Sequence, residues 1–225
     1  MKIIKKLFFN TYLAKYFLPV ALWLEGKLYK AISRLAVLAN NGVHPKHRIT
    51  KYQEWFADHL SKDWSVYEVG SHTGAMTKTI GQNVARVLAI EIIPELVEIA
   101  KKRNSLDNVE FITGDATKFQ LESPVDCIVL SNVLEHIDQR VAFLKGLLTN
   151  TNWNGEKRLL IRVPLITRDW ISCYKKELGI DYRRDPTHFT EYTEKEITEE
   201  LNQANIQIHN FDKRFGEAFL VCEGH

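Results

Sequence analysis

Glycine and acidic residues follow successive apolar segments of this 225-residue sequence at spacings that could hold a nucleoside. In VYEVGSHTG, Gly70 and Gly74 permit a sharp turn that brings backbone N–H groups and a helix start close to a ligand. Glu91, about twenty residues further on, could accept hydrogen bonds from both hydroxyls of a ribose. Asp115 could accept one from an exocyclic amine such as adenine N6. Together these residues predict an adenosine pocket.

These residues can meet only if the segments before them are neighbouring strands of one sheet, because ligands bind beyond the carboxyl ends of parallel strands. Helical and strand patterns alternate from residue 49 onward. The predicted helices cover 49–62, 75–84, 94–104, 133–150 and 193–205, and the predicted strands cover 65–69, 85–92, 108–115, 125–132, 157–164, 206–215 and 216–224. The first five strands predict a parallel sheet covered by helices on both faces. The last two have no helix between them and predict an antiparallel pair.

Five motifs in this order resemble the class I S-adenosylmethionine-dependent methyltransferases, within them the group that acts on small molecules and on glycan or lipid precursors. They are YEVGSHTG (67–74), VLAIEI (87–92), FITGDATKF (111–119), VDCIVLSNVLEHI (125–137) and DPTHFTEYTEKEI (185–197). The resemblance covers residues 44–223 and implies a Rossmann-like α/β fold with a seven-stranded, mostly parallel sheet in the order 3-2-1-4-5-7-6. It also implies S-adenosylmethionine as cofactor and S-adenosylhomocysteine as product. The cofactor-binding residues that it implies are Glu68, Gly70, Ser71, His72, Gly74, Glu91, Ile92, Asp115, Ala116, Ser131 and Asn132.

The glycine loop departs from the family pattern at one position. That pattern is acidic-x-Gly-x-Gly-x-Gly, whereas this sequence has Glu68, Gly70, His72 and Gly74. Histidine can adopt a left-handed conformation at modest strain, so the backbone can accept the change. Three interpretations stay open for the imidazole: a hydrogen bond to nearby backbone or to the N-terminal segment, a contact to cofactor or substrate, or a loop that binds the cofactor poorly.

Histidines and a basic, aromatic segment are the candidates for chemistry on the acceptor. Methyl transfer to a hydroxyl needs alignment and removal of a proton, and a neutral histidine suits the second task. His136 and His188 are the predicted catalytic residues, with packing or helix capping as their alternative roles. The segment 165–192 is the predicted substrate lid, and its predicted substrate-binding residues, which could receive an anion or stack on a sugar ring, are Arg168, Trp170, Tyr174, Arg183 and Arg184. A solvated basic face explains the same charges.

Residues 1–43 form a predicted helical extension before a methyltransferase domain at 44–225. Seven basic residues against Glu25 give residues 1–40 a net charge of +6, which leaves −4 for the rest of a chain whose total is +2. No apolar run is long enough to span a bilayer. We expect one or two helices, broken near Pro19, which either pack on the domain or a second subunit as a lid, or lie on an anionic membrane surface with Phe8, Phe9, Phe17, Leu22 and Trp23 inserted.

The remaining composition narrows the classes of function. Cys127, Cys173 and Cys222 lie far apart, which predicts neither a disulfide framework nor a zinc site; we expect no metal and a reducing cytoplasm, at most with contact to the inner membrane face. The charge balance does not predict nucleic-acid binding. The leading hypothesis is an O-methyltransferase for a sugar, a surface-polysaccharide or lipid-linked precursor, or another small molecule. An NAD-dependent oxidoreductase and a non-catalytic scaffold or regulator are the alternatives.

Overall fold

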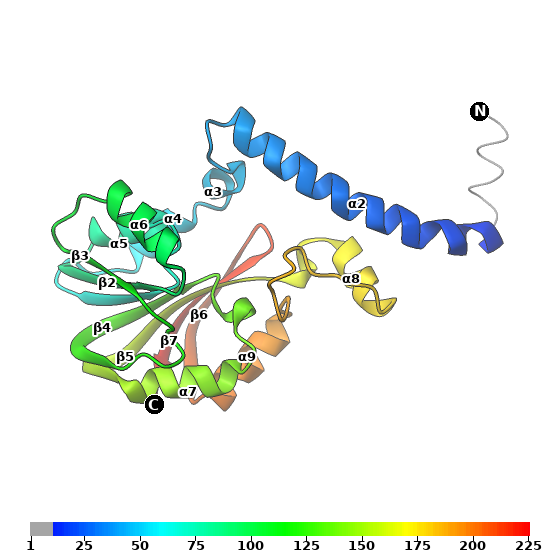
Figure 1. The fold of residues 1–225 in the computed structure, drawn as a ribbon. Coiled ribbons are helices and arrows are strands. Elements are labelled where there is room, and N and C mark those ends of the chain that lie inside the picture. The colour runs from blue at the N-terminus through cyan, green and yellow to red at the C-terminus, as the bar shows by residue number, and fades with distance from the viewer. Residues whose placement is uncertain (1–10) are drawn as a thin grey trace.

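A seven-stranded sheet organises the protein, of which the computed structural model describes residues 11–225 (Figure 1). Its order is β3-β2-β1-β4-β5-β7-β6, as predicted. The strands are β1 Ser65–Val69, β2 Arg86–Glu91, β3 Val109–Thr113, β4 Leu121–Ser131, β5 Thr151–Pro164, β6 Ile206–Arg214 and β7 Glu217–Gly224. The first five pair in parallel, whereas β7 runs antiparallel to both β5 and β6. The carboxyl ends of β1 to β5 therefore meet at one edge.

Helices cover both faces of this sheet, with α4, α5 and α6 on one side and α7 and α9 on the other (Figure 1). The α-helices are α2 Thr11–Ala39, α3 Pro45–Thr50, α4 Tyr52–Asp58, α5 Ala75–Gly81, α6 Pro94–Arg103, α7 Arg140–Asn150, α8 Trp170–Glu177 and α9 Glu194–Gln203. Two 3-10 helices, η1 Leu134–His136 and η2 Ile166–Arg168, follow β4 and β5. Both lie at the edge where the strands end.

Successive residues of a strand belong to two separate apolar cores, one on each face of the sheet. Tyr67 and Leu88 belong to the core under α7 and α9, whereas their neighbours Val66 and Val87 belong to the core under α4 and α5. Because successive side chains of a strand point to opposite faces, a strand buried on both faces must be apolar almost throughout. This explains why Glu68, a charged residue inside β1, stands out.

Two predicted helices are each interrupted. The helix predicted at 49–62 is split into α3 and α4 by Lys51, whose φ of 50° is left-handed. The helix predicted at 133–150 is replaced by η1, an extended residue at Ile137 (φ −98°, ψ 128°) and then α7. Periodic apolar spacing does not reveal a change of backbone direction at a single residue. Here these changes orient α4 and α7 so that they pack on the sheet.

Helix α2 is the element that differs most from the expectation. It runs without interruption through Pro19, so the predicted break is wrong; the proline removes one backbone hydrogen bond without ending the helix. Figure 1 shows α2 extending away from the sheet, above α8. Residues 1–10 of the predicted extension, including Phe8 and Phe9, lie outside the described residues. Within 11–225 no helix has the length and apolar character needed to cross a bilayer.

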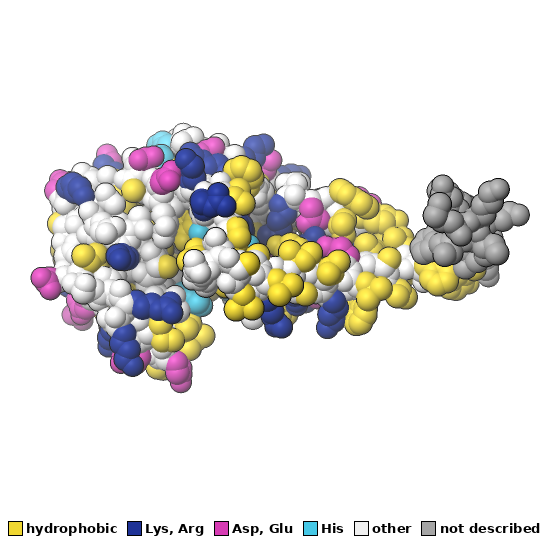
Figure 2. All heavy atoms as spheres, turned by 90° about the horizontal axis from the view of Figure 1, so that it is seen from above, with side chains coloured by type: hydrophobic (Ala, Val, Ile, Leu, Met, Phe, Trp, Pro, Cys, Tyr) yellow, Lys and Arg dark blue, Asp and Glu magenta, His cyan; other side chains and the backbone are white. Residues whose placement is uncertain are grey.

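One side of α2 is tied to the insert that contains α8, and the other is exposed. Glu25 accepts hydrogen bonds from Lys175 Nζ (2.8 Å) and Arg184 Nη1 (2.7 Å), and the Arg184 guanidinium lies over the Tyr29 ring. Leu22 is buried, whereas apolar side chains remain exposed along the helix beside basic ones (Figure 2). The structure therefore has features of both interpretations, packing against the domain and an apolar surface open to a partner.

Candidate active site

The loop between β1 and α5 has the conformation that a close ligand approach needs. Gly70, His72 and Gly74 all have positive φ, at 74°, 49° and 77°. A Cβ on Gly70 would lie 2.9 Å from Val133 Cγ2, and one on Gly74 would lie 3.1 Å from Ala100 Cβ. Both glycines are thus required by space as well as by φ. His72 adopts the left-handed conformation expected of it, and its side chain is exposed.

Glu91 joins this loop to the end of β2. Its Oε2 accepts a hydrogen bond from the backbone N–H of His72 (2.9 Å), and its Oε1 accepts one from that of Ile93 (3.0 Å). The contribution of position 72 to the loop is therefore made by its backbone, which any residue that tolerates this φ could supply. Each carboxylate oxygen keeps a second lone pair, so Glu91 can still accept bonds from a ribose.

Buried polar atoms without partners lie next to this loop. Glu68 is 1% exposed and Ser71 is 3% exposed; Glu68 Oε2 and Ser71 Oγ make no hydrogen bond within residues 11–225. Burial raises the pKa of Glu68 to about 7, and the nearby Glu91 charge adds to the shift. Because an unpaired buried polar atom is costly, these two fit a site that a polar ligand completes.

The other predicted cofactor residues line the same edge. Asp115 Oδ1 accepts hydrogen bonds from Thr117 N (3.0 Å) and Oγ1 (2.7 Å), and the hydroxyl bond lowers the pKa of Asp115. An adenine amine would have to share this carboxylate. Ala116 is partly buried, as are Ser131 and Asn132, whereas Ile92 is exposed at the rim.

A buried ion-pair network supports the end of β4. The register places Ser131 beside Arg162 on β5, and Arg162 Nε donates to Asn132 Oδ1 (3.0 Å). Glu217 pairs with Lys46 and, at 3.6 Å, with Arg162, whose guanidinium lies 4.0 Å from the Tyr52 ring centroid. Arg162 Nη1 is buried without a hydrogen-bond partner among the described residues. Sequence reasoning missed this network, although an arginine inside the apolar run LLIRVP was a signal.

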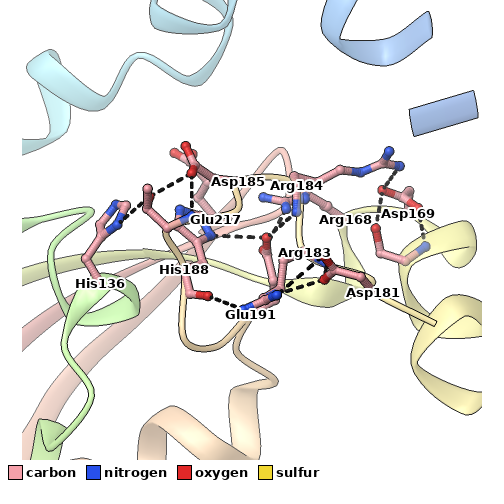
Figure 3. A network of polar contacts seen from close by, with 12 residues as sticks. His136, Arg168, Asp169, Asp181, Arg183, Arg184, Asp185, His188, Glu191 and Glu217 are labelled. Carbon is pink, nitrogen blue, oxygen red and sulfur yellow. Dashed lines mark hydrogen bonds and ion pairs between the residues drawn. The ribbon is translucent and has the colours of Figure 1, made fainter. Parts of the chain in front are cut away.

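His136 and His188, the predicted catalytic pair, meet beside the end of β4 (Figure 3). Their ring centroids are 4.6 Å apart and the rings are nearly perpendicular. His136 Nδ1 contacts Thr187 Oγ1 (3.1 Å), and His188 Nδ1 contacts Glu191 Oε1 (3.1 Å). Burial, together with the His188 charge, lowers the pKa of His136. The insert therefore brings its histidine onto η1, although the two lie far apart in the sequence.

Two buried glutamates in this region were not predicted. Glu135, in η1, is fully buried, and its backbone carbonyl accepts a hydrogen bond from Phe189 N (2.8 Å). Glu191, also fully buried, accepts bonds from Arg168 Nη2 (2.6 Å) and from the backbone N–H of Arg184 (2.9 Å). Burial opposes ionisation of Glu191, but the His188 hydrogen bond and the Arg168 charge lower its pKa. For Glu135 the sequence held a signal, because this carboxylate directly precedes the candidate histidine in LEH.

The predicted substrate-binding residues differ in how free their side chains are. Arg168 pairs with Glu191, and Arg183 pairs with Asp181. Arg184 pairs at its two ends with Glu25 and Asp169. An anionic substrate would have to share these arginines with acids already present. Trp170 is 72% exposed at the start of α8, with Tyr174 near it, so these two rings stay accessible.

The comparisons with known proteins agree with this arrangement. Residues 67–152, from β1 to the start of β5, match the methyltransferase domain family. This region holds the glycine loop, Glu91, Asp115 and the LEH segment. This region of the chain thus matches a methyltransferase domain, in line with the resemblance to the class I S-adenosylmethionine-dependent methyltransferases. The match supports S-adenosylmethionine as the cofactor.

Curated relatives match only part of the chain. The mitochondrial ubiquinone biosynthesis O-methyltransferase of Schizosaccharomyces pombe is 31% identical over 114 residues, which are 45% of this chain and 42% of that protein. A probable ribosomal RNA small subunit methyltransferase A of Thermococcus onnurineus is 36% identical over 78 residues, 35% of this chain and 28% of that protein. The matches thus span less than half the length of these relatives.

Solved structures share the fold over most of both chains. A SAM-dependent methyltransferase from Aquifex aeolicus gives a TM-score of 0.59 at 17% identity and covers 88% of this chain and 97% of that one. The magnesium protoporphyrin IX methyltransferase from Synechocystis PCC 6803, solved with bound SAH, gives 0.59 at 18% identity and covers 80% and 82%. At these identities the likeness concerns the fold.

Proposed function

We propose that this protein transfers a methyl group from S-adenosylmethionine to a hydroxyl oxygen of a small molecule, such as a sugar or a surface-polysaccharide or lipid-linked precursor. The observation that carries the proposal is the His136–His188 pair beside the end of β4, one strand away from the glycine loop. The name of the curated O-methyltransferase relative supports oxygen as the acceptor atom.

The residues on the edge of the sheet supply the positions that binding requires. Glu91 is suited to the ribose and Asp115 to the adenine, and the loop at 70–74 approaches the methionine part. Arg162 Nη1, which lacks a partner among the described residues, is suited to the carboxylate of the cofactor's amino-acid end. S-adenosylmethionine supplies an electrophilic methyl group, whose bond to sulfur breaks with the electron pair going to sulfur.

The histidine pair is suited to the acceptor. With both Nδ1 atoms engaged, by Thr187 and Glu191, each ring leaves its Nε2 for the acceptor side. The lowered pKa of His136 keeps this imidazole neutral at pH 7, as removal of a hydroxyl proton requires. The exposed ring of Trp170 and the half-buried ring of Tyr174 are suited to stack on a sugar or another flat acceptor.

Titration calorimetry with S-adenosylmethionine, S-adenosylhomocysteine and NAD tests the cofactor. We expect the first two to bind and NAD not to. Glu91→Gln should weaken binding, whereas Glu95→Gln, an exposed acid in the first turn of α6, should not. Failure of the first two ligands to bind, or a preference for NAD, would overturn the proposal.

Transfer of a labelled methyl group tests the acceptor class. We expect label in sugar nucleotides, lipid-linked glycans or small phenols, and none in ribosomal RNA. The ribosomal RNA is included because a curated relative is named for it. Label confined to RNA would refute the small-molecule assignment while leaving the methyl transfer itself in place.

We also propose that α2 contacts an anionic membrane surface. Its side opposite Leu22 and Glu25 exposes apolar residues, and basic residues flank them: Val20, Leu24, Leu28 and Leu35, with Lys27, Lys30 and Arg34 beside them. An apolar stripe bordered by lysine and arginine suits a helix lying in the headgroup region.

Sedimentation with vesicles containing anionic lipid tests this contact. The double change Leu24→Glu and Leu28→Glu should abolish sedimentation of the full chain, whereas Ile99→Glu on α6 should not. If the wild-type chain stays in the supernatant and instead dimerises through α2 in analytical ultracentrifugation, a second copy covers the stripe and the membrane assignment is wrong.

A further inference from the structure

We propose that Glu135, His136 and His188 bind one divalent transition-metal ion, such as Zn²⁺ or Mn²⁺. The three side chains offer ligand atoms that all lie within 4.8 Å of one another. Zinc binds imidazole nitrogen and carboxylate oxygen at about 2.0–2.2 Å, which places tetrahedral ligands about 3.4 Å apart. Small rotations of the three side chains would therefore bring their ligand atoms within coordination distance of one ion. This inference replaces our expectation from the sequence that no metal binds.

Glu135 is the first reason. Its side chain is 0% exposed, and neither Oε1 nor Oε2 makes a hydrogen bond within the described part of the chain. An ionised carboxylate in such a position is unfavourable unless a cation or donors compensate it. The carboxylate lies with two imidazoles, and the Arg162 charge acts on it without a hydrogen bond, so a bound cation would supply the direct partner that the two oxygens lack among the described residues.

The hydrogen bonds of the two histidines are the second reason. Thr187 Oγ1 donates to Asp185 Oδ1 (2.7 Å), so it accepts from His136 Nδ1–H. Glu191 Oε1 accepts from His188 Nδ1–H. Both rings are therefore held as the tautomer with a lone pair on Nε2. A metal-binding histidine usually has its other nitrogen bound to a carboxylate or another acceptor, which fixes the ring in this way.

The charges around the cluster tolerate a cation. The acid Asp185 accepts a hydrogen bond from Thr187, which contacts His136, and the acid Glu191 accepts one from His188. Arg168 pairs with Glu191 on the side away from His188, at 2.6 Å from Oε2, while His188 uses Oε1 (Figure 3). Two imidazoles and one carboxylate favour a first-row transition ion over Mg²⁺ or Ca²⁺, which prefer oxygen ligands throughout.

Three protein ligands leave coordination positions open, as in catalytic metal sites. Given the proposed function, on which this role rests, the acceptor hydroxyl would occupy one of them. The ion would lower the pKa of that hydroxyl, and its proton would leave to solvent. The oxygen would then form its bond to the methyl carbon as the carbon–sulfur bond breaks. With the ion bound, His136 and His188 would act as ligands, so the proton-acceptor role proposed above for His136 would apply only to the protein without the metal.

Binding of Co²⁺, Zn²⁺, Mn²⁺ and Mg²⁺ to chelator-treated full-length protein tests the site, by calorimetry and by the visible absorption of Co²⁺. We expect one ion per chain, with Mg²⁺ the weakest. Glu135→Gln and His188→Gln should each weaken binding by at least about 100-fold, and Glu191→Gln by about 10-fold to 100-fold. The matched control is His209→Gln, which removes the exposed His209–Glu223 pair (3.0 Å) elsewhere on the surface.

The outcomes separate this inference from the proposed function. Absence of stoichiometric binding, or equal affinities in wild type and in Glu135→Gln, overturns the metal site. S-adenosylmethionine titrated into the same metal-free samples reports on the cofactor site independently. Cofactor binding without metal binding would reject the metal alone, and metal binding without cofactor binding would reject the methyltransferase alone. Thermal melting of each variant identifies any that fails to fold.

Discussion

The pKa of the Glu68 carboxyl group reports how completely water is excluded from the end of β1, beside the glycine loop at 70–74. Glu68 lies in the central strand β1, aligned with Ala89 on β2 and Val129 on β4, and is 1% exposed. Burial raises its pKa from 4.5 to about 7. Between these two values the folded protein binds more protons than the unfolded chain, so the free energy of unfolding falls as the pH rises through this window.

The size of the effect follows from the two pKa values. With 4.5 in the unfolded chain and about 7 in the folded protein, ionisation of Glu68 lowers the free energy of unfolding by roughly 2–3 kcal/mol between pH 5 and pH 8. For a chain of this length, this corresponds to roughly 5–10 °C in Tm. Glu68→Gln keeps the shape of the side chain and cannot ionise. The variant should therefore gain roughly 2–3 kcal/mol over the wild type across this interval.

Urea denaturation of the ligand-free protein at pH 5 and pH 8 measures this gain, and comparison of variant with wild type cancels the titration of groups that do not interact with Glu68. The control is Glu122→Gln, an exposed carboxyl on β4, for which we expect no pH-dependent difference. A Glu68→Gln difference that stays constant from pH 5 to pH 8 would refute the reasoning, because it would mean that the carboxylate is solvated or paired.

Three further changes test other parts of the structure. His72→Gly should leave the Kd for S-adenosylmethionine equal or lower in calorimetry, because the backbone of residue 72 makes the contact to Glu91; a clear loss of affinity would assign the imidazole to the site. Glu217→Gln should lower the free energy of unfolding by about 3–5 kcal/mol in urea, because Arg162 and Lys46 lose their buried partner; a loss below about 1 kcal/mol would contradict this. Glu25→Gln should speed proteolysis of α2 without lowering the Tm of the domain, because α2 is held by Lys175 and Arg184; unchanged cleavage would argue against that attachment.

The strands were predictable because each is a short apolar segment between clear breaks. The positions of β1, β2 and β3 agree with the prediction, and the resemblance implied the observed strand order. The ends of helices were less predictable. The left-handed residue Lys51 and the extended residue Ile137 divide helices that read as continuous, since apolar periodicity carries no signal for a single change of backbone conformation.

The acceptor side of the site was predictable only in part. His136 and His188 were identified as residues with suitable chemistry, but their contact depends on the insert folding back so that Phe189 N binds the carbonyl of Glu135. From the sequence, the arginines of the insert were expected to be available for an anionic substrate. In the structure, Arg168 and Arg184 form ion pairs with buried or half-buried acids. Pairing across such sequence separations leaves no local pattern.

The sequence by itself determined the sheet, the glycine loop and the acidic residues at the strand ends, because strand periodicity and turn chemistry are local properties of the chain. The tertiary structure decided which charges are buried and what they face. It left the Glu135 carboxylate without a hydrogen-bond partner among residues 11–225, next to two oriented imidazoles, and it placed Arg162 against Asn132. Burial and hydrogen-bond partners arise only when distant segments pack together. For that reason the residues proposed to bind the cofactor could be chosen from the sequence, whereas the proposed metal site could be inferred only from the fold.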